Sequence, residues 1–331
     1  MPYCKALDNH LFVSITGEFA TCCNAPFQKY DTVKDFQESD YVKEVKDTMQ
    51  NGWHSNCETC RLHEEKGIQS KRFMHNAFMS KYKNVDLNLS NTCNLTCRMC
   101  NSKASSKWAE LLNEPNDFLF DHKQLDWPNL YRIRYNGGEP FITKQFEDII
   151  DLCIENDVII HVNTNATFFP KKYIDKIQKL KKFYVAFSID GIDKVDEYIR
   201  HGTDWNKKLE IIDQWMQYKN IYFSINATIQ AYNIHDYDNI IDFAKQRNLS
   251  IANEDVTRPA YLQLNALPEE YVEKVQTPNN KKYFKNYSFN EKLFKELCLK
   301  TKMHDQLLGR SLKSINPLLA SYLDKYNIRS E

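Results

Sequence analysis

Apolar residues recur along most of the chain at the spacing of alternating strands and helices. Short runs rich in Val, Ile, Phe and Tyr alternate with longer segments whose apolar positions fall every three or four residues. The predicted strands lie at 85–89, 131–135, 158–164, 183–189, 221–229 and 250–256. The predicted helices between them lie at 103–113, 144–156, 171–181, 205–219 and 236–247. Six strand–helix units in succession predict parallel pairing with right-handed crossovers, and therefore an α/β fold.

The two ends of the chain have different patterns. Residues 11–18 predict a β-hairpin with Gly17 in its turn, and the apolar positions from 41 to 49 predict a helix that packs on it. Residues 61–81 predict a polar linker helix. We therefore expect three parts, which are a small module at 1–70 followed by the linker helix to about 81, a central domain at 82–270, and a C-terminal helical extension at 271–331.

Composition narrows the class of protein. The 331 residues include 44 basic and 44 acidic side chains, and this balance does not suggest a nucleic-acid or membrane-surface partner. No apolar run reaches the length of a membrane span, and the first residues do not resemble a signal peptide. We expect a soluble, cytoplasmic protein. In such a protein, ten cysteines favour metal binding over a disulfide scaffold.

Three cysteines follow directly after the first predicted strand of the central domain. Cys93, Cys97 and Cys100 have the spacing C-x3-C-x2-C, and thiolates are suited to iron–sulfur clusters or zinc. Both kinds of centre normally take four protein ligands, whereas only three thiols are available locally. A site with one ligand missing is suited to a reaction, as in catalytic zinc sites that keep an open position. The alternative is a zinc site completed from elsewhere in the chain.

A second group of cysteines lies in the N-terminal module. Its pattern is C-x12-G-x4-C followed by C-x2-C, formed by Cys4, Gly17, Cys22, Cys57 and Cys60. Four thiols in such a small unit would make a closed site, either structural or electron-conducting. Cys23 adjoins Cys22 and could replace it, but the spacing from Gly17 favours Cys22. A four-cysteine zinc knuckle is the alternative.

Polar motifs also end the next three predicted strands. They are Asn136-Gly137-Gly138-Glu139-Pro140, Asn163-Thr164-Asn165-Ala166 and Ser188-Ile189-Asp190-Gly191, with Arg200 twelve positions after Ser188. The two glycines let a ligand approach the backbone, and a carboxylate such as Glu139 suits an ammonium group. The guanidinium of Arg200 matches a carboxylate. The structural alternatives are an ordinary turn, an Asn turn and a helix-capping turn, respectively.

Together these motifs resemble those of the radical SAM superfamily. The C-x3-C-x2-C triplet and the GGEP sequence occur here in the order that the superfamily has. The resemblance implies a partial (β/α)6 barrel of the TIM type, with the chemistry at the C-terminal ends of the strands. It implies a [4Fe–4S] cluster on Cys93, Cys97 and Cys100, with S-adenosylmethionine (SAM) on the fourth iron. The residues implied to contact SAM are Met99, Gly137, Gly138, Glu139, Asn165, Ser188, Asp190 and Arg200.

The N-terminal cysteine pattern resembles the twitch module, a shortened SPASM domain. This resemblance implies an auxiliary [4Fe–4S] cluster on Cys4, Cys22, Cys57 and Cys60. In most relatives the module follows the barrel, whereas here it precedes it. Met99 occupies a position that is usually aromatic, and Ala166 stands where relatives often have glycine.

The same resemblance implies a radical enzyme. An external one-electron reductant of the flavodoxin or ferredoxin type would drive cleavage of SAM to a 5′-deoxyadenosyl radical, which removes a hydrogen atom from a substrate. The substrate would be a peptide or protein side chain, or alternatively a sugar or other small metabolite. The sequence does not indicate which group acts on the substrate. A different class also fits the cysteines, namely a non-catalytic protein with structural zinc or iron–sulfur centres.

Four further residues are expected to be structural. Cys153 and Cys298 lie in apolar stripes and are expected to be buried thiols. His161 and His201 are expected to be hydrogen-bonded structural residues.

Overall fold

The structure, a computed structural model, describes residues 2–65, 67, 69–78, 83–115 and 120–329. Its centre is an eight-stranded sheet in the order β10-β9-β7-β6-β5-β3-β1-β2, in which only β1 and β2 pair antiparallel. The strands of this sheet are β1 (His10–Val13), β2 (Phe19–Ala20), β3 (Lys83–Asn88), β5 (Leu130–Asn136), β6 (Ile159–Thr164), β7 (Phe183–Ser188), β9 (Ile221–Ile229) and β10 (Ser250–Asp255). Strands β4 (Thr96–Cys97) and β8 (Arg200–His201) form a separate antiparallel ribbon.

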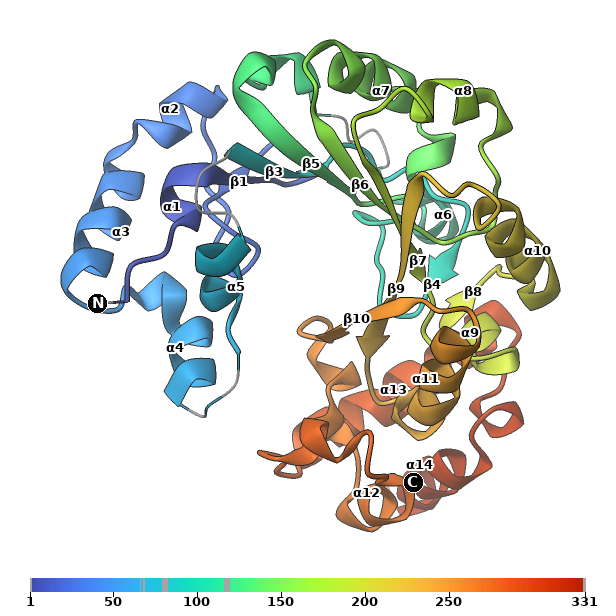
Figure 1. Cartoon of the computed structure of the whole chain (residues 1–331). Helices are drawn as coiled ribbons and strands as arrows, with labels where there is room; N and C mark the ends of the chain where they lie inside the picture. The colour runs from blue at the N-terminus through green and yellow to red at the C-terminus, as the bar shows by residue number, and fades with distance from the viewer. Residues whose placement is uncertain (1, 66, 68, 79–82, 116–119, 330–331) are drawn as a thin grey trace.

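The six strands predicted for the central domain are β3, β5, β6, β7, β9 and β10, and they pair in parallel with one another. The α/β class is therefore confirmed. The sheet curves, with helices along its outer side (Figure 1). The helices of the central domain are α6 (Ser106–Leu112), α7 (Phe146–Glu155), α8 (Ile174–Ile177), α9 (Lys194–Ile199), α10 (Trp205–Trp215) and α11 (Tyr237–Gln246).

The two faces of the sheet differ in polarity. On one face, side chains such as Leu87, Ile133 and Val185 are fully buried in the main core, together with apolar residues of α7 and α10 such as Ile149 and Trp215. Side chains on the other face alternate with these, and they are mostly polar. Since the outer face packs on helices, the polar face is the concave one. We call this face the inner face of the sheet.

The N-terminal hairpin is part of the central sheet. Strand β1 pairs in parallel with β3, so that Leu11 lies opposite Val85. The predicted hairpin is present, and it extends the barrel sheet by two strands. The helices around it are α1 (Ala6–Asn9), α2 (Val33–Gln37) and α3 (Asp40–Asn51).

The segment predicted as one linker helix at 61–81 is not one helix. It contains the end of α4 (Glu58–Glu65) and all of α5 (Lys71–Phe78). Gly67 lies between them with φ +68°, a conformation that ends a right-handed helix. Residues 66, 68 and 79–81 of the predicted helix lie outside the described residues.

The last part of the chain is helical, as predicted. It comprises α12 (Glu269–Val275), α13 (Glu291–Leu308) and α14 (Pro317–Arg329), with short 3-10 turns between them. Helix α13 packs against the 3-10 turns Ala260–Leu262 and Leu264–Ala266, which follow β10. Within the described ranges, every helix is too short or too polar to cross a membrane.

Candidate active site at the C-terminal edge of the sheet

The loop with Cys93, Cys97 and Cys100 leaves the C-terminal end of β3 and is fixed by hydrogen bonds. The Ser106 hydroxyl, at the start of α6, accepts from the backbone N–H of Cys93 at 3.0 Å and donates to the Cys93 carbonyl at 3.1 Å. The Trp108 indole N–H donates to the Cys97 carbonyl at 2.9 Å. Cys97 itself lies in β4, directly opposite Arg200 in β8. The three thiols are therefore presented from a rigid loop.

The three sulfurs influence one another's protonation. A hydrogen bond from Cys100 lowers the pKa of Cys97, and the charge of Arg200 acts in the same direction against burial. Burial, with a contribution from Cys97, raises the pKa of Cys93 to about 12. The sulfurs are thus close enough for strong mutual effects, and thiolates formed here would be buried together.

Two side chains direct hydrogen-bond donors at these sulfurs. Arg200 Nη1 lies 4.0 Å from the Cys97 sulfur, and Asn165 Nδ2 lies 4.0 Å from the Cys93 sulfur. Hydrogen bonds and positive charge at the ligating sulfurs stabilise an iron–sulfur cluster and set its potential. This donor set fits a cluster with three thiolate ligands.

Across the described part of the chain, no group of three or more His, Cys, Asp or Glu side chains is arranged to hold a single metal ion. In a cubane cluster each thiolate binds a different iron, so its ligands need not converge on one point. The arrangement of the three thiols is therefore compatible with a cluster.

The loop is supported from behind by Arg98, whose side chain is fully buried. Its guanidinium lies 3.6 Å from the centre of the Tyr198 ring, and Arg98 Nε donates to the Tyr198 carbonyl at 2.9 Å. Arg98 Nη2 pairs with Asp305 of α13 at 2.6 Å. The C-terminal extension thus fixes the residue between Cys97 and Met99.

Gly138 lies against the start of the cysteine loop. A Cβ at this position would collide with the carbonyl oxygen of Thr92 and would lie 2.8 Å from that of Ser90, and φ is +56°. The next N–H, of Glu139, donates to the Thr92 carbonyl at 2.7 Å. The space beside Gly138 is therefore filled by the chain itself, where the sequence suggested room for a ligand. Gly137, with φ +80°, packs on the Asn88 side chain.

The Glu139 carboxylate connects two strand ends. It is buried and accepts hydrogen bonds from the Thr164 hydroxyl at 2.8 Å, the Asn165 N–H at 2.7 Å and the Phe141 N–H at 3.4 Å. Burial raises the pKa of Glu139 to about 7 despite these donors. A cationic group beside it would restore the ionised form.

Asn165 combines a turn role with a place at the site. Its Oδ1 accepts from the N–H of Thr167 at 3.0 Å, as the turn interpretation predicts, while its Nδ2 points at Asn94 and Cys93. Ala166 has φ +55°, which explains why glycine suits this position in relatives.

Ser188, Asp190 and Arg200 lie in one buried network. Arg200 Nη2 pairs with Asp190 Oδ2 at 2.8 Å, and Asp190 Oδ1 accepts from the Thr228 N–H at 2.7 Å. Although burial opposes it, Asp190 raises the pKa of Arg200 above its usual value. The guanidinium proposed for a SAM carboxylate therefore already has one carboxylate partner.

Sequence reasoning missed the other half of this network, Lys208 and Asp196. Lys208 is completely buried; its Nζ pairs with Asp196 at 2.6 Å and donates to the Ser188 carbonyl at 2.8 Å. Asp196 accepts from the Asp190 N–H at 3.0 Å. No local pattern distinguishes Lys208 from the exposed lysines around it, because its role depends on how α10 packs on β7.

Comparison with known proteins identifies the central domain. Residues 87–244 match the Radical SAM superfamily. The chain contains a radical SAM domain. Proteins of this superfamily are enzymes that use a [4Fe–4S] cluster, SAM and an external reductant, in agreement with the cofactors expected from the sequence.

Individual relatives are distant. The chain is 24% identical over 193 residues to the uncharacterized protein MJ0907 of Methanocaldococcus jannaschii (54% of this chain, 63% of that protein). It is 22% identical over 156 residues to the sporulation killing factor maturation protein SkfB of Bacillus subtilis (47% and 38%). Among solved structures, native anSMEcpe with bound AdoMet has a TM-score of 0.47 at 18% identity, covering 69% of this chain and 67% of that one. The chain thus spans less than two thirds of the length of MJ0907 and of SkfB.

The second cysteine group lies outside the radical SAM domain, at the opposite end of the sheet. Cys4 precedes β1 and Cys22 follows β2, so both are near the N-terminal ends of β1 and β3. Cys57 and Cys60, around the start of α4, are close enough to Cys4 to raise its pKa, after burial, to about 11. The structure therefore brings these four thiols into one group.

Cys23 also belongs to this neighbourhood but faces a different way. Cys22 packs with Cys4 and Cys57 in a small apolar cluster, whereas the thiol of Cys23 is exposed. The groups that act on the Cys23 thiol include Lys71, Asp86 and Glu254, which belong to the inner face of the sheet and to α5. Cys22 is thus the better placed partner for Cys4.

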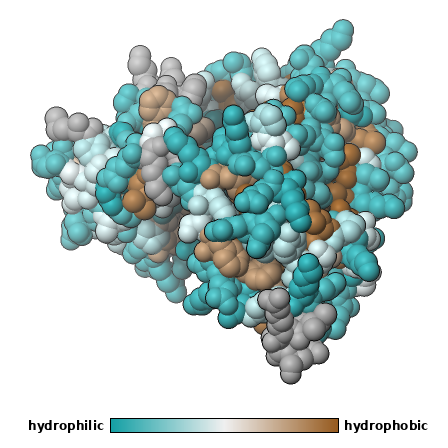
Figure 2. Space-filling view, turned by 90° about the horizontal axis from the view of Figure 1, so that it is seen from below, coloured by the Kyte–Doolittle hydropathy of each residue, from teal (hydrophilic) through white to brown (hydrophobic). Residues whose placement is uncertain are grey.

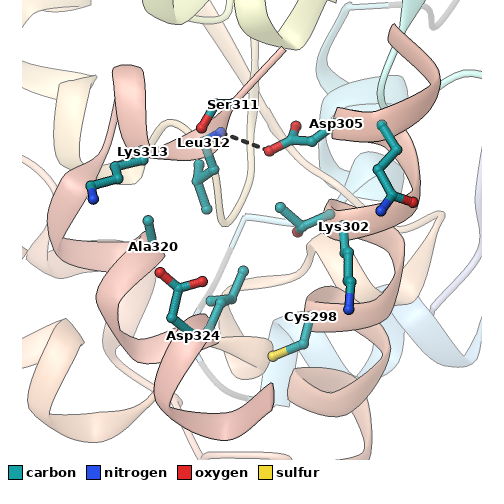
Figure 3. Close-up of a pocket in the computed structure, with 11 residues that line it drawn as sticks. Cys298, Lys302, Asp305, Ser311, Leu312, Lys313, Ala320 and Asp324 are labelled. Atoms are coloured by element: carbon teal, nitrogen blue, oxygen red, sulfur yellow. Dashed lines mark hydrogen bonds between the residues drawn. The ribbon is translucent and has the colours of Figure 1, made fainter. Parts of the chain in front are cut away.

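Among the cavities that adjoin the C-terminal extension, two differ in their relation to the cysteine loop. One of about 320 Å³ lies beside the radical SAM domain's cysteine loop and is lined by Met99, Cys100, Trp108, Arg258 and His304, among others. The other, of about 560 Å³, lies between α13 and α14, and Figure 3 shows Cys298, Asp305 and Asp324 around it. The second cavity contains none of the predicted site residues.

The residues predicted to be structural have mixed outcomes. Cys153 and Cys298 are buried, as expected. His201 lies 3.4 Å from Arg310 Nε. His161 contacts the Tyr184 ring, but its Nε2 has no hydrogen-bond partner in the described part of the chain, contrary to the expectation of a hydrogen-bonded residue.

Proposed function

We propose that this chain is a radical SAM enzyme in which Cys93, Cys97 and Cys100 hold a [4Fe–4S] cluster and leave one iron for SAM. The observation that supports this most directly is the triplet of thiols on one loop, with donors from Arg200 and Asn165 directed at two of the sulfurs. When bound and reduced, the cluster supplies the electron that cleaves SAM to methionine and a 5′-deoxyadenosyl radical.

The chain's own residues would position SAM. Glu139 would accept from its amino group, and Arg200, held by Asp190, would face its carboxylate. Ser188 lies opposite Asn226 on the inner face, where both can reach the ribose. The backbone of Met99 would contact the adenine. Burial of these groups excludes water from the reacting atoms.

We assign the second group of thiols, Cys4, Cys22, Cys57 and Cys60, to an auxiliary [4Fe–4S] cluster of the twitch type. Four thiols in one small group are the support for this proposal. An auxiliary cluster there would orient the substrate or accept an electron from the product radical.

Anaerobic reconstitution with iron and sulfide, followed by iron counting and a 5′-deoxyadenosine assay with dithionite and SAM, tests both assignments. The wild type should contain about eight irons, four per cluster, and should form 5′-deoxyadenosine. The triple variant C93A/C97A/C100A should retain about four irons and form none. The variant C57A/C60A should also retain about four irons. A colourless zinc protein without SAM cleavage would favour the non-catalytic alternative.

A matched pair of variants distinguishes the two adjacent cysteines. Cys22→Ala should lose about four irons, whereas Cys23→Ala should keep the full content of about eight. The reverse result would transfer the ligand role to Cys23.

The proposed substrate is a peptide or protein side chain. SkfB, one of the relatives, is named as a maturation protein for the sporulation killing factor. The alternative is a sugar or other small metabolite. Incubation of the reduced enzyme and SAM with candidate substrates, followed by mass spectrometry, would decide between them.

A further inference from the structure

The inner face of the sheet has a row of charged and aromatic side chains halfway along the strands. In the observed register Asp86 lies opposite Arg134, Arg134 opposite His161, His161 opposite Tyr184, and Tyr184 opposite Tyr222. These five residues come from five adjacent strands, β3, β5, β6, β7 and β9. We call them the inner row.

Arg134 and His161, at the centre of the inner row, have unused donors or acceptors. Arg134 makes no hydrogen bond or ion pair with any residue that the structure describes, and its Nε is buried. His161 Nε2 is likewise buried without a partner in that part of the chain. Burying such groups without a partner is unfavourable, and more so when they are charged. A bound ligand would remove this cost.

The acidic groups near the inner row already have partners. Asp86 lies 3.4 Å from His10 Nε2. Burial alone would raise the pKa of Asp86, but His10, Arg134 and Arg132 hold this pKa well below its usual value. Glu254 of β10 pairs with Lys71 of α5 at 2.7 Å. Each carboxylate thus has another partner within ion-pair distance, and Arg134 acts on both only from a longer range.

Positive charge is in excess at the centre of the row. Arg132 lies two residues before Arg134 on the same face of β5, and burial followed by the charge of Arg134 lowers the pKa of Arg132. Burial, followed by the charges of Arg134 and Arg132, lowers the pKa of His161 to about 3, so this ring is neutral at physiological pH. The planar guanidinium fork of Arg134 matches a carboxylate or phosphate group.

At its other end the inner row consists of two tyrosines, one of which is exposed to solvent. The Tyr184 and Tyr222 rings are stacked with centroids 4.8 Å apart, and Tyr222 is 51% exposed. The inner row is therefore accessible to solvent at Tyr222.

The row lies between the two cysteine groups. The sulfurs of Cys93, Cys97 and Cys100 are beyond the C-terminal strand ends, and the second group is near the N-terminal ends of β1 and β3. Arg134 precedes Asn136, the last residue of β5, by two residues, or roughly 7 Å at the rise of a strand. A layer of amides separates the two levels, with Asn163 Nδ2 donating to Asn136 Oδ1 at 2.7 Å.

We propose that the inner row is the substrate site and that the substrate has an anionic group, a carboxylate or a phosphate, that binds to Arg134. This inference rests on the proposed radical SAM function. The anion would be anchored by the guanidinium fork with His161 beside it, while the rest of the substrate extends along the amide layer toward the C-terminal edge of the sheet. Tyr184 and Tyr222 would line its side.

Anion binding to the reconstituted full chain tests this proposal without turnover. Inorganic phosphate and acetate are titrated by calorimetry at constant ionic strength, against the wild type, Arg134→Gln, Arg134→Lys and the control Arg247→Gln. Arg247 lies near Asp213, outside the barrel, so its variant makes the same charge change elsewhere. We expect Arg134→Gln to weaken binding at least tenfold, Arg134→Lys to weaken it less, and Arg247→Gln to leave it unchanged.

The result identifies the anion as well. Stronger binding of phosphate indicates a phosphorylated substrate, and stronger binding of acetate indicates a carboxylate. Equal binding by the wild type and both Arg134 variants, or an equal loss in Arg247→Gln, would overturn the proposal. If Arg134→Gln does not fold, Arg134→Lys decides. Failure of the radical SAM function would instead appear as a lack of 5′-deoxyadenosine from the wild type and from Arg247→Gln.

Discussion

At Gly138 the chain passes so close to itself that one methyl group would separate two parts of the site. The missing Cβ allows the Glu139 N–H to bond to the Thr92 carbonyl, which fixes the GGE turn to the start of the cysteine loop. Glycine is thus required at position 138 by the close approach of the cysteine loop as well as by φ +56°.

Gly138→Ala should therefore lower the free energy of unfolding by about 3 kcal/mol, combining overpacking with an unfavourable φ. Urea unfolding of the unreconstituted protein gives this value, and iron content should fall as well. Gly309→Ala is the matched control, since Gly309 has φ +60° but no atom within 4 Å of an added Cβ, and it should cost only about 1 kcal/mol. Equal costs for the two variants would mean that the contact with Thr92 is unimportant.

The Glu139 carboxylate gives a second prediction, on the pH dependence of SAM binding. With a pKa of about 7, it is protonated in part at neutral pH, and only its ionised form attracts a cationic amino group. Glu139→Gln should weaken SAM binding by about 10- to 100-fold above pH 7, the worth of a hydrogen bond to a charged group. The ratio of the two dissociation constants should shrink as the pH falls below 7.

Anaerobic calorimetry with SAM on both proteins provides the measurement. Titration of SAM itself affects both proteins equally, so it cancels in the ratio. A ratio that is constant from pH 6 to 8 would show that Glu139 does not sense the ligand.

Among elements, the contact between the cysteine loop and α13 makes the clearest prediction. Arg98 has no exposed surface, and Asp305 is its ion-pair partner. Asp305→Asn should cost about 3 kcal/mol, because it leaves a buried guanidinium without a counter-charge. Asp242→Asn, which removes the exposed pair with Lys245, should cost less than about 0.5 kcal/mol.

Both values come from urea unfolding, and the absorbance of the reconstituted cluster should also change in Asp305→Asn but not in Asp242→Asn. Similar stability of the two variants would show that α13 does not support the loop.

The elements themselves were largely predictable, because their periodicity is local. The six barrel strands were predicted to within two residues. The helix predicted at 171–181 was too long. It consists of a 3-10 turn, the short α8 and further i→i+3 bonds such as Lys179 N–H to the Lys176 carbonyl. The parallel pairing of β1 with β3 could not be predicted, since an extended hairpin has no local signal for its neighbour.

In the site, too, the features with a local sequence signal were predictable and those set by tertiary packing were not. Strand ends carry polar motifs that can be recognised along the chain, so the thiols, Glu139 and Arg200 could be proposed from the sequence. Their partners were not, because Lys208 reaches Ser188 from a helix and Asp305 reaches Arg98 across 207 positions. Such contacts are set by tertiary packing rather than by spacing.

For the whole molecule, His235 predicts how stability depends on pH. Its ring nitrogen Nδ1 lies 3.1 Å from Asn316 Nδ2, which links the 3-10 turn Ile234–Asp236 to the start of α14, and burial lowers the pKa of His235 to about 4. The unfolded chain binds this proton below about pH 6.5 and the folded protein only near pH 4. The contribution is therefore complete above pH 6.5 and is lost as the pH falls.

Urea unfolding of the wild type and His235→Gln from pH 7.5 to 5 measures this effect. The stability of the wild type relative to the variant should drop by about 1–2 kcal/mol over this range. A difference that does not change with pH would contradict the buried neutral ring.

The pairing of β1 with β3 has a consequence for how this protein can be divided. The first sixty residues are not an independent domain that can be deleted. Their deletion would leave the backbone N–H and C=O groups along one side of β3 without partners. In the truncated protein β3 would be an unpaired edge strand, to which the edge strand of another copy can pair. Truncation should therefore produce aggregates, so the thiols of the N-terminal segment are best removed by substitution.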